Sequence, residues 1–286
     1  MHSGLKALLN SGGFAQKPDG IYSAQMPFLG SVQNDERELR ERVAAHRYDN
    51  YLAAIARSHS IPVMDYEVDR FLAKMPKGAL ILDIGGCWGW HWRRIAKARP
   101  DIGVLIIDFV RPNLTHAINV LGTLLDEQVA LMHADATALP FITDRGLFDG
   151  VWTVQTFQHI PDFTNAAKEA HRVLKSGGYF INYSLHNTPL NKLIHKLLSK
   201  PYHSEGVVKN TFYLTRASNS QLKIIEDIFG SKVLDGYAEC LFHPDLKLTF
   251  TGRLGSLLGR FDVLLNNILP IGYLIARQRI FGAVKL

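Results

Sequence analysis

The sequence contains few cysteines, no long apolar run and no block of like charge. Only two of its 286 residues are cysteine, too few for a disulfide framework or a cysteine zinc site, and we expect no metal centre. No run reaches the roughly 18 apolar residues that a membrane-spanning helix needs, and residues 1–6 lead into polar sequence instead of a signal peptide. We therefore expect a reduced, cytoplasmic protein.

The charge of the chain is only mildly basic. Lys and Arg number 32 against 26 for Asp and Glu, which gives a formal net charge of +6. An excess of this size favours phosphates or anionic headgroups through long-range attraction. The basic residues are scattered, however, and form no run of the kind that binds nucleic acid. We expect no nucleic-acid partner, and the composition leaves room for peripheral contact with a membrane.

The chain divides into three parts that differ in their pattern of apolar and polar residues. Residues 1–75 are an irregular arm followed by helical spacing, residues 76–184 alternate short apolar runs with amphipathic stretches, and residues 185–286 are less regular. Within the first part we expect a short helix at 66–74 and another that is capped by Asn34 or Asp35. The latter carries an apolar stripe at Leu39, Val43, Tyr48, Tyr51, Leu52 and Ile55.

The middle part alternates expected strands with expected helices. The strands are at 79–82, 104–107, 129–132, 150–152 and 179–183. The helices are at 90–98, after Pro112 and at 163–174. Strands that alternate with helices form a mostly parallel sheet with helices on both faces, so the pattern predicts a doubly wound α/β fold.

The last part is predicted to add helices at 189–200 and 218–229 and strands at 233–242 and 272–280. Between the two strands, a helical apolar face comprises Leu254, Leu257, Leu258, Phe261, Leu264 and Leu265. This face either covers the sheet or contacts a lipid-like substrate, and we favour the first interpretation.

The strongest local signal is the turn that follows strand 79–82, with the sequence Asp-Ile-Gly-Gly-Cys-Trp-Gly at 83–89. Glycines there let the backbone take strained dihedral angles and approach a ligand, although a tight structural turn explains them as well. Ligands of such sheets bind at the carboxyl ends of the strands.

Acids end three successive strands of the expected sheet. Asp108 ends the second strand, 25 positions after Asp83, and Asp135 follows the third. A carboxylate in the place of Asp108 can accept hydrogen bonds from both hydroxyls of a ribose, and Asp135 can accept one from an adenine amine. This placement predicts a nucleoside ligand.

In order and spacing, residues 79–184 resemble the core of class I S-adenosylmethionine-dependent methyltransferases of the ubiquinone/menaquinone type. The matching segments are the glycine turn, the strand end at Asp108, and residues 135–141, 148–162 and 172–178. The resemblance implies a Rossmann-like, seven-stranded sheet. It also implies an N-terminal helical lid at 1–75, a cofactor-binding core at 76–184, and acceptor-site insertions at 185–286.

The resemblance implies a role for each site residue. The methionine and ribose part of S-adenosylmethionine is assigned to Asp83, Gly85, Gly86 and Gly89. The ribose and adenine are assigned to Asp108, Phe109, Asp135 and Ala136. The sulfonium end is assigned to Thr153, Val154 and Gln155. His159 is the candidate general base, because histidine titrates near working pH; a side chain that braces the Pro161 turn is the alternative.

The resemblance implies methyl transfer. We expect an oxygen or carbon atom of a small-molecule or lipid-linked acceptor to receive the methyl group, and the oligomeric state stays open. One position departs from the family pattern, because Cys87 stands at the middle glycine of the turn. This substitution keeps open a cofactor-binding partner subunit without catalysis. A nicotinamide-dependent oxidoreductase is the other alternative, but the turn lacks the G-x-G-x-x-G spacing of that class.

Overall fold

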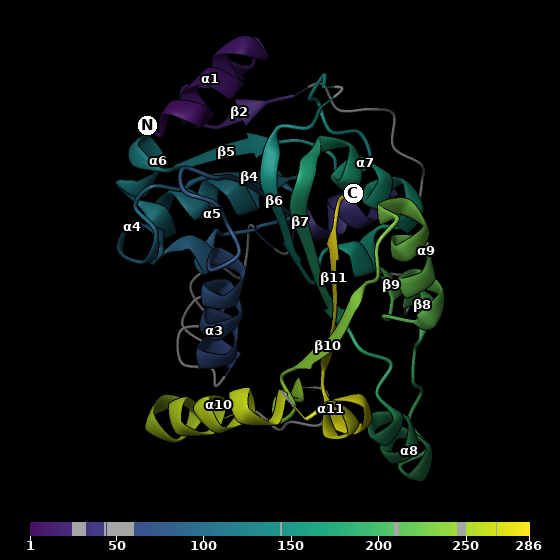
Figure 1. The fold of residues 1–286 in the computed structure, drawn as a ribbon. Helices are drawn as coiled ribbons and strands as arrows, with labels where there is room; N and C mark the ends of the chain where they lie inside the picture. Colours follow the sequence, from purple (N-terminus) through teal and green to yellow (C-terminus); the bar gives the residue numbers. More distant parts are fainter. Residues whose placement is uncertain are drawn as a thin grey trace.

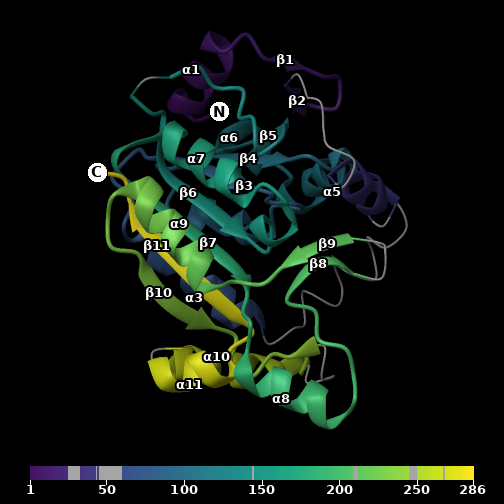
Figure 2. The same cartoon turned by 90° about the vertical axis from the view of Figure 1, so that its right-hand side faces the viewer.

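The computed structural model describes residues 1–24, 33–42, 44, 60–143, 145–208, 212–244, 250–266 and 268–286. Its centre is a nine-stranded sheet with helices packed against both faces (Figures 1 and 2). In spatial order the strands are β1 (Ala15–Gln16), β2 (Tyr22–Ser23), β5 (Val129–His133), β4 (Gly103–Asp108), β3 (Leu80–Ile84), β6 (Phe148–Val154), β7 (Leu174–Leu185), β11 (Gln278–Val284) and β10 (Leu234–Ala238).

The sheet is mostly parallel. Parallel pairing runs without interruption from β2 through β5, β4, β3 and β6 to β7. β11 is antiparallel to both β7 and β10, and β1 is antiparallel to β2. The expected doubly wound α/β fold is confirmed, and the two short strands β1 and β2 extend the seven-stranded sheet at its β5 edge.

Two layers of helices enclose the sheet. One face is covered by α3 (Ser60–Leu72), α4 (Ile95–Ala98), α5 (Arg111–Leu121) and α6 (Leu124–Glu127). The other face is covered by α1 (Ser3–Ser11), α7 (Phe163–Val173) and α9 (Asn219–Phe229). Because side chains alternate along a strand, β4 contributes to both layers: Leu105 and Ile107 pack on the side of α1, whereas Val104 and Ile106 pack toward α5.

The remaining elements lie around the carboxyl ends of the parallel strands and at one end of the molecule. They are a helical segment at 33–42, the 3₁₀ turns η1 (Trp90–Trp92) and η2 (Phe157–His159), the antiparallel pair β8 (Glu205–Val208) and β9 (Phe212–Thr215), and the helices α8 (Pro189–Leu197), α10 (Gly252–Asn266) and α11 (Leu269–Ile275). None of the described helices has the length and hydropathy to cross a bilayer.

Several expected elements differ from the structure. The strand expected at 272–280 is wrong in its first part, because Pro270 lies in the first turn of α11 and the strand begins only at Gln278, opposite Leu185 of β7. The helix expected at 90–98 is divided into η1 and α4. The N-terminal arm contains the helix α1, whose leucines Leu5, Leu8 and Leu9 are buried.

The apolar stripe expected to cover the sheet from 254 to 265 faces outward instead. Leu254, Leu257, Phe261 and Leu264 are each more than half exposed, and Leu258 and Leu265 are only partly buried. The core interpretation of this stripe is therefore wrong. In the stripe expected after Asn34, the positions Val43, Tyr48, Tyr51, Leu52 and Ile55 lie outside the described residues.

Candidate functional site

Two cavities adjoin at the carboxyl ends of the parallel strands. The smaller one, of about 240 Å³, lies over the ends of β3, β4 and β5. The larger one, of about 560 Å³, lies between the glycine turn, α3 and the segments that follow β10 and α11. Four residues line both cavities: Gly85, Cys87, Val154 and Gln155. Molecules held in the two cavities would therefore meet at the ends of β3 and β6.

The glycine turn is closely packed on its surroundings. A Cβ atom on Gly85, whose φ is +70°, would lie 2.2 Å from the side chain of Thr156, and one on Gly86 would lie 2.2 Å from the Oδ2 atom of Asp83. Gly89 packs against Leu121 of α5 and lines neither cavity. The glycines at these positions therefore allow the close approach of other protein groups.

Residues with a strained, left-handed backbone conformation cluster around the larger cavity. Among the described residues, four that are not glycine have a positive φ, and three of them, Cys87, Gln155 and Glu239, line this cavity. Such conformations cost of order 1–3 kcal/mol each and persist where the surrounding structure imposes them, most often at functional sites. Burial, and next the neighbouring Asp108, raise the pKa of the Cys87 thiol well above its usual value, so the thiol stays protonated.

Asp108 lies at the end of β4 on the wall of the smaller cavity. Its carboxylate accepts hydrogen bonds from the backbone N–H groups of Val110 (2.8 Å) and Cys87 (3.1 Å). Burial raises the pKa of Asp108 to about 6, against the lowering effect of these hydrogen bonds. The side-chain amide of Asn113 lies 3.5 Å from its Oδ2 atom as a third and longer contact. A carboxylate has about four acceptor positions, so Asp108 keeps room for a donor that enters the cavity, and for a second one that displaces the Asn113 amide.

The other two strand-end acids are also held in place. The Oδ2 atom of Asp83 accepts a hydrogen bond of 2.6 Å from the indole of Trp92, and Asp83 lines the larger cavity. Asp135 lines the smaller cavity, where it accepts from the backbone N–H of Thr137 (2.6 Å) and from the Gln33 amide (2.7 Å). Burial raises the pKa of Asp83 to about 7.

His159 lines the smaller cavity, but both of its ring nitrogens are engaged. Nδ1 lies 2.8 Å from the carbonyl oxygen of Tyr213 in β9, which can only accept, so Nδ1 carries the proton. Nε2 lies 3.2 Å from Arg40 and 3.1 Å from the side-chain nitrogen of Gln158. Burial, and next Arg40, lower the pKa of His159 to about 4. This geometry favours a bracing role, directed at β9 and not at the turn before Pro161.

The other expected site residues fall into two groups. Phe109 and Ala136 line the smaller cavity together with Asp108 and Asp135. Thr153 lies within β6, is fully buried, and lines neither cavity. Within the described ranges, no group of three His, Cys, Asp or Glu side chains has a geometry that could hold a metal ion.

A polar cluster in the larger cavity was missed by the sequence analysis. The buried Glu239 accepts hydrogen bonds from Arg277 (2.6 Å) and Gln278 (2.7 Å). Arg277 also lies 3.3 Å from the Oε1 atom of Gln155 and stacks over Phe242, 5.0 Å from the ring centroid. These residues come from segments without a recognisable motif, and only their pairing across β10 and β11 brings them together.

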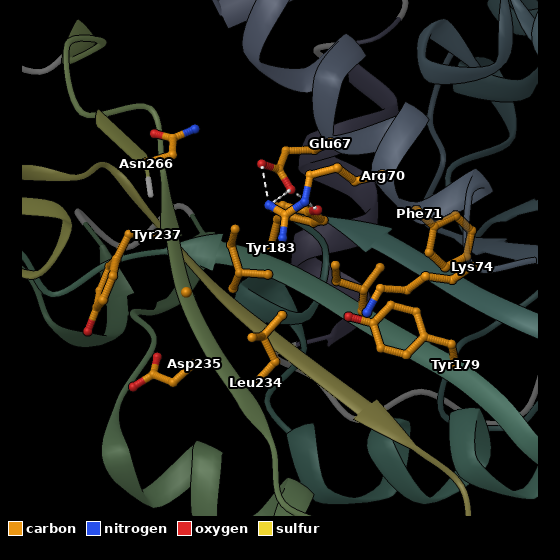
Figure 3. Close-up of a pocket in the computed structure, with 13 residues that line it drawn as sticks. Glu67, Arg70, Phe71, Lys74, Tyr179, Tyr183, Leu234, Asp235, Tyr237 and Asn266 are labelled. Carbon is orange, nitrogen blue, oxygen red and sulfur yellow. Dashed lines mark hydrogen bonds and ion pairs between the residues drawn. The ribbon is translucent and has the colours of Figure 1, made fainter. Parts of the chain in front are cut away.

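A third cavity, of about 160 Å³, lies between α3, β7, β11 and β10 (Figure 3). Its deepest charged group, Glu67, accepts a hydrogen bond from the hydroxyl of Tyr183 (2.8 Å) and forms an ion pair with Arg70 (3.1 Å). This cavity shares no lining residue with the other two, and its charged groups largely satisfy one another. We therefore assign it no part in the site.

Comparison with known proteins identifies the class. Residues 82–182 match a family model described as a methyltransferase domain. Together with the fold, this match shows that the chain carries a class I S-adenosylmethionine-dependent methyltransferase domain.

Individual relatives agree with this class. The chain is 33% identical over 150 residues to malonyl-[acyl-carrier protein] O-methyltransferase of Geobacter sulfurreducens, an alignment that covers 51% of this chain and 52% of that protein. It is 41% identical over 76 residues to demethylmenaquinone methyltransferase of Staphylococcus epidermidis, covering 26% of this chain and 31% of that protein. The chain thus matches about half the length of the first of these curated relatives and about a third of the second.

A solved structure shares the fold. Phosphoethanolamine N-methyltransferase 2 of Haemonchus contortus, in complex with S-adenosyl-L-methionine, matches with a TM-score of 0.51 and 18% identity over 77% of this chain and 52% of that one. S-adenosylmethionine is the cofactor of this class. The lining of the smaller cavity fits such a group, because two buried hydrogen-bond acceptors, Asp108 and Asp135, line it together with the aromatic residue Phe109.

Proposed function

We propose that this protein transfers a methyl group from S-adenosylmethionine to an oxygen or carbon atom of a small-molecule or lipid-linked acceptor. The observation that carries the proposal is the junction of the two cavities at Gly85, Cys87, Val154 and Gln155. Methyl transfer is an in-line displacement that requires the donor and the acceptor to approach from opposite sides of one carbon. Two cavities that share four lining residues suit this arrangement.

In this proposal the smaller cavity holds the cofactor. Asp108 accepts hydrogen bonds from the ribose hydroxyls, Phe109 packs on the adenine, and Asp135 with the backbone of Ala136 contacts the adenine edge. Gly85 and Gln155 lie beside the methyl-bearing end, and Asp83 and Gly86 adjoin this end from the wall of the larger cavity. When bound, the cofactor supplies a methyl group attached to a sulfonium. Loss of this methyl group turns the sulfonium into a neutral thioether, which is a good leaving group.

The larger cavity is proposed to hold the acceptor. Its walls include the aromatic side chains of Trp88, Trp90, Phe242 and Phe250 together with the charged pair Glu239 and Arg277. An aromatic wall with a few fixed polar groups suits an acceptor with a ring or an apolar chain and one polar end. The two relatives act, by their names, on acceptors of different chemistry, and it is the lining of this cavity that selects the acceptor in this proposal.

We propose that positioning contributes more to the reaction than a general base. The candidate base His159 donates from one ring nitrogen and is capped by Arg40 and Gln158 at the other. Its pKa of about 4 makes it a weak proton acceptor at neutral pH. In this proposal His159 acts as a positioning residue that holds β9 over the smaller cavity.

Calorimetric titration with S-adenosylhomocysteine tests the proposal. We expect Asp108→Ala to weaken binding at least tenfold, because hydrogen bonds to a charged group contribute about 1.5–3 kcal/mol and 1.4 kcal/mol is a factor of ten. Asp227→Ala, which removes an exposed carboxylate on α9, is the matched control and should bind like the unaltered protein.

Two results would speak against the proposal. No binding by the folded protein would contradict the cofactor assignment. Binding without methyl transfer to any quinone, fatty acyl or small hydroxylated acceptor would favour a non-catalytic partner subunit, the alternative that Cys87 keeps open.

A further inference from the structure

α10 is amphipathic with its apolar side outward. Its buried positions are the small or polar residues Gly255, Gly259, Asp262 and Asn266. Its exposed positions include Leu254, Leu257, Phe261 and Leu264, which are 56%, 65%, 52% and 64% exposed. The spacing of three, four and three residues places these four side chains in one stripe along the helix. A stripe of this kind normally packs against another surface.

Two further helices at the same end of the molecule share this property. Figures 1 and 2 both show α8, α10 and α11 together, at the end opposite α1. On α8, Leu193 and Leu197 are 52% and 74% exposed, and on α11 Tyr273 and Leu274 are 51% and 50% exposed. We call the exposed faces of these three helices the apolar end. Exposed apolar side chains gathered on neighbouring helices mark an interaction site.

The exposed charges of the apolar end are all positive. Residues 189–200 contribute Lys192, Lys196 and Lys200, and α10 contributes Arg253 and Arg260, all exposed. The one acid within residues 189–200, 250–266 and 268–276 is Asp262, which is fully buried. Apolar helix faces flanked by Lys and Arg are complementary to a bilayer that carries anionic headgroups.

The apolar end is continuous with the larger cavity. Phe250 and Thr251 line that cavity and lead directly into α10. Asp262 of α10 accepts hydrogen bonds from the backbone N–H groups of Cys240 (2.7 Å) and Leu241 (3.0 Å). These bonds fix the segment whose neighbouring residues form the cavity wall.

We propose that the apolar end docks this protein on the surface of an anionic lipid bilayer. The leucines and Phe261 enter the boundary between headgroups and acyl chains, and the lysines and arginines contact lipid phosphates. The consequence for the acceptor rests on the proposed function: the larger cavity then opens beside the bilayer, and its acceptor is a lipid-linked molecule.

Vesicle sedimentation tests the docking. We expect the full chain to bind vesicles of phosphatidylcholine with phosphatidylglycerol, to bind pure phosphatidylcholine at least tenfold more weakly, and to be released by salt. Leu257→Glu and Phe261→Glu should each lower the bound fraction at least tenfold. Ile142→Glu is the matched control, because Ile142 is fully exposed and adjoins Phe141, which packs on Phe14 near α1.

The outcomes separate docking from the proposed function. Titration with S-adenosylhomocysteine in the absence of lipid should give the same affinity for all these variants, which shows that they fold and that the cofactor site is intact. Equal loss of vesicle binding in Ile142→Glu, or no binding to anionic vesicles by the unaltered chain, would overturn the docking proposal. So would a dimer in light scattering that Leu257→Glu dissociates, since a second copy would then cover the apolar end.

Discussion

Cys87 is the residue at which this chain departs most clearly from the family pattern, and the structure shows the consequence. Its φ of +52° lies in the left-handed region, where a side chain costs roughly 1–2 kcal/mol because Cβ crowds the following carbonyl. Its backbone N–H donates to Asp108, and its side chain lies where the two cavities meet. The turn therefore keeps its hydrogen bond to Asp108 with a strained residue at its centre.

We expect Cys87→Gly to raise the free energy of unfolding by about 1 kcal/mol, since glycine adopts this conformation without steric cost. Urea unfolding measures the change. Cys240→Gly, at a buried cysteine without a positive φ, is the control and should be destabilising. The account of Cys87 would be wrong if both variants lost stability to the same extent.

The pKa of Asp108, raised to about 6 by burial, predicts a pH dependence of cofactor binding. Below pH 6 the carboxyl becomes protonated and accepts hydrogen bonds from hydroxyl groups less well. The dissociation constant of S-adenosylhomocysteine should therefore rise up to about tenfold between pH 7 and pH 5.

Calorimetry at several pH values checks this dependence. Asp83 also has a raised pKa, and it is still present in the variant Asp108→Asn. The difference between the pH profile of the unaltered protein and that of the variant therefore isolates the contribution of Asp108. A profile of the unaltered protein that parallels the variant's would contradict this role.

At the scale of elements, α10 is amphipathic as expected, but its apolar face is exposed and its small and polar face is buried. The apolar period of its sequence is genuine, but the buried face is made by Gly255, Gly259, Asp262 and Asn266. Asp262 decides the orientation, because its carboxylate satisfies two backbone N–H groups that would otherwise be buried without partners.

We expect Asp262→Ala to lower the free energy of unfolding by about 2–3 kcal/mol, because it leaves the N–H groups of Cys240 and Leu241 unpaired. Asp262→Asn should cost less, since its amide oxygen still accepts one hydrogen bond. Thermal unfolding followed by circular dichroism measures both variants. If Asp262→Ala lowered the free energy of unfolding no more than the exposed substitution Asp227→Ala does, other contacts would hold α10 in place.

On the scale of the whole molecule, the two cavities differ in how widely their lining residues are spread along the sequence. Most of the smaller cavity is built by residues 84–160, where each strand end is followed by its own turn. The larger cavity also draws on Ser60 to Met64 of α3, on Glu239 and on Arg277. A cavity assembled from such distant segments has no local signature.

The sequence alone determined the order of the strands and helices from 79 to 184, because buried parallel strands require continuous apolar runs and their turns require glycine. It also placed Asp83, Asp108 and Asp135 at one edge of the sheet, since the ends of parallel strands coincide there. Only the tertiary structure decided which face of α10 is buried. It also decided that His159 binds β9, and that Glu239 meets Arg277. These outcomes depend on partners more than 20 positions away in the sequence, and a local pattern of hydrophobic residues does not encode such partners.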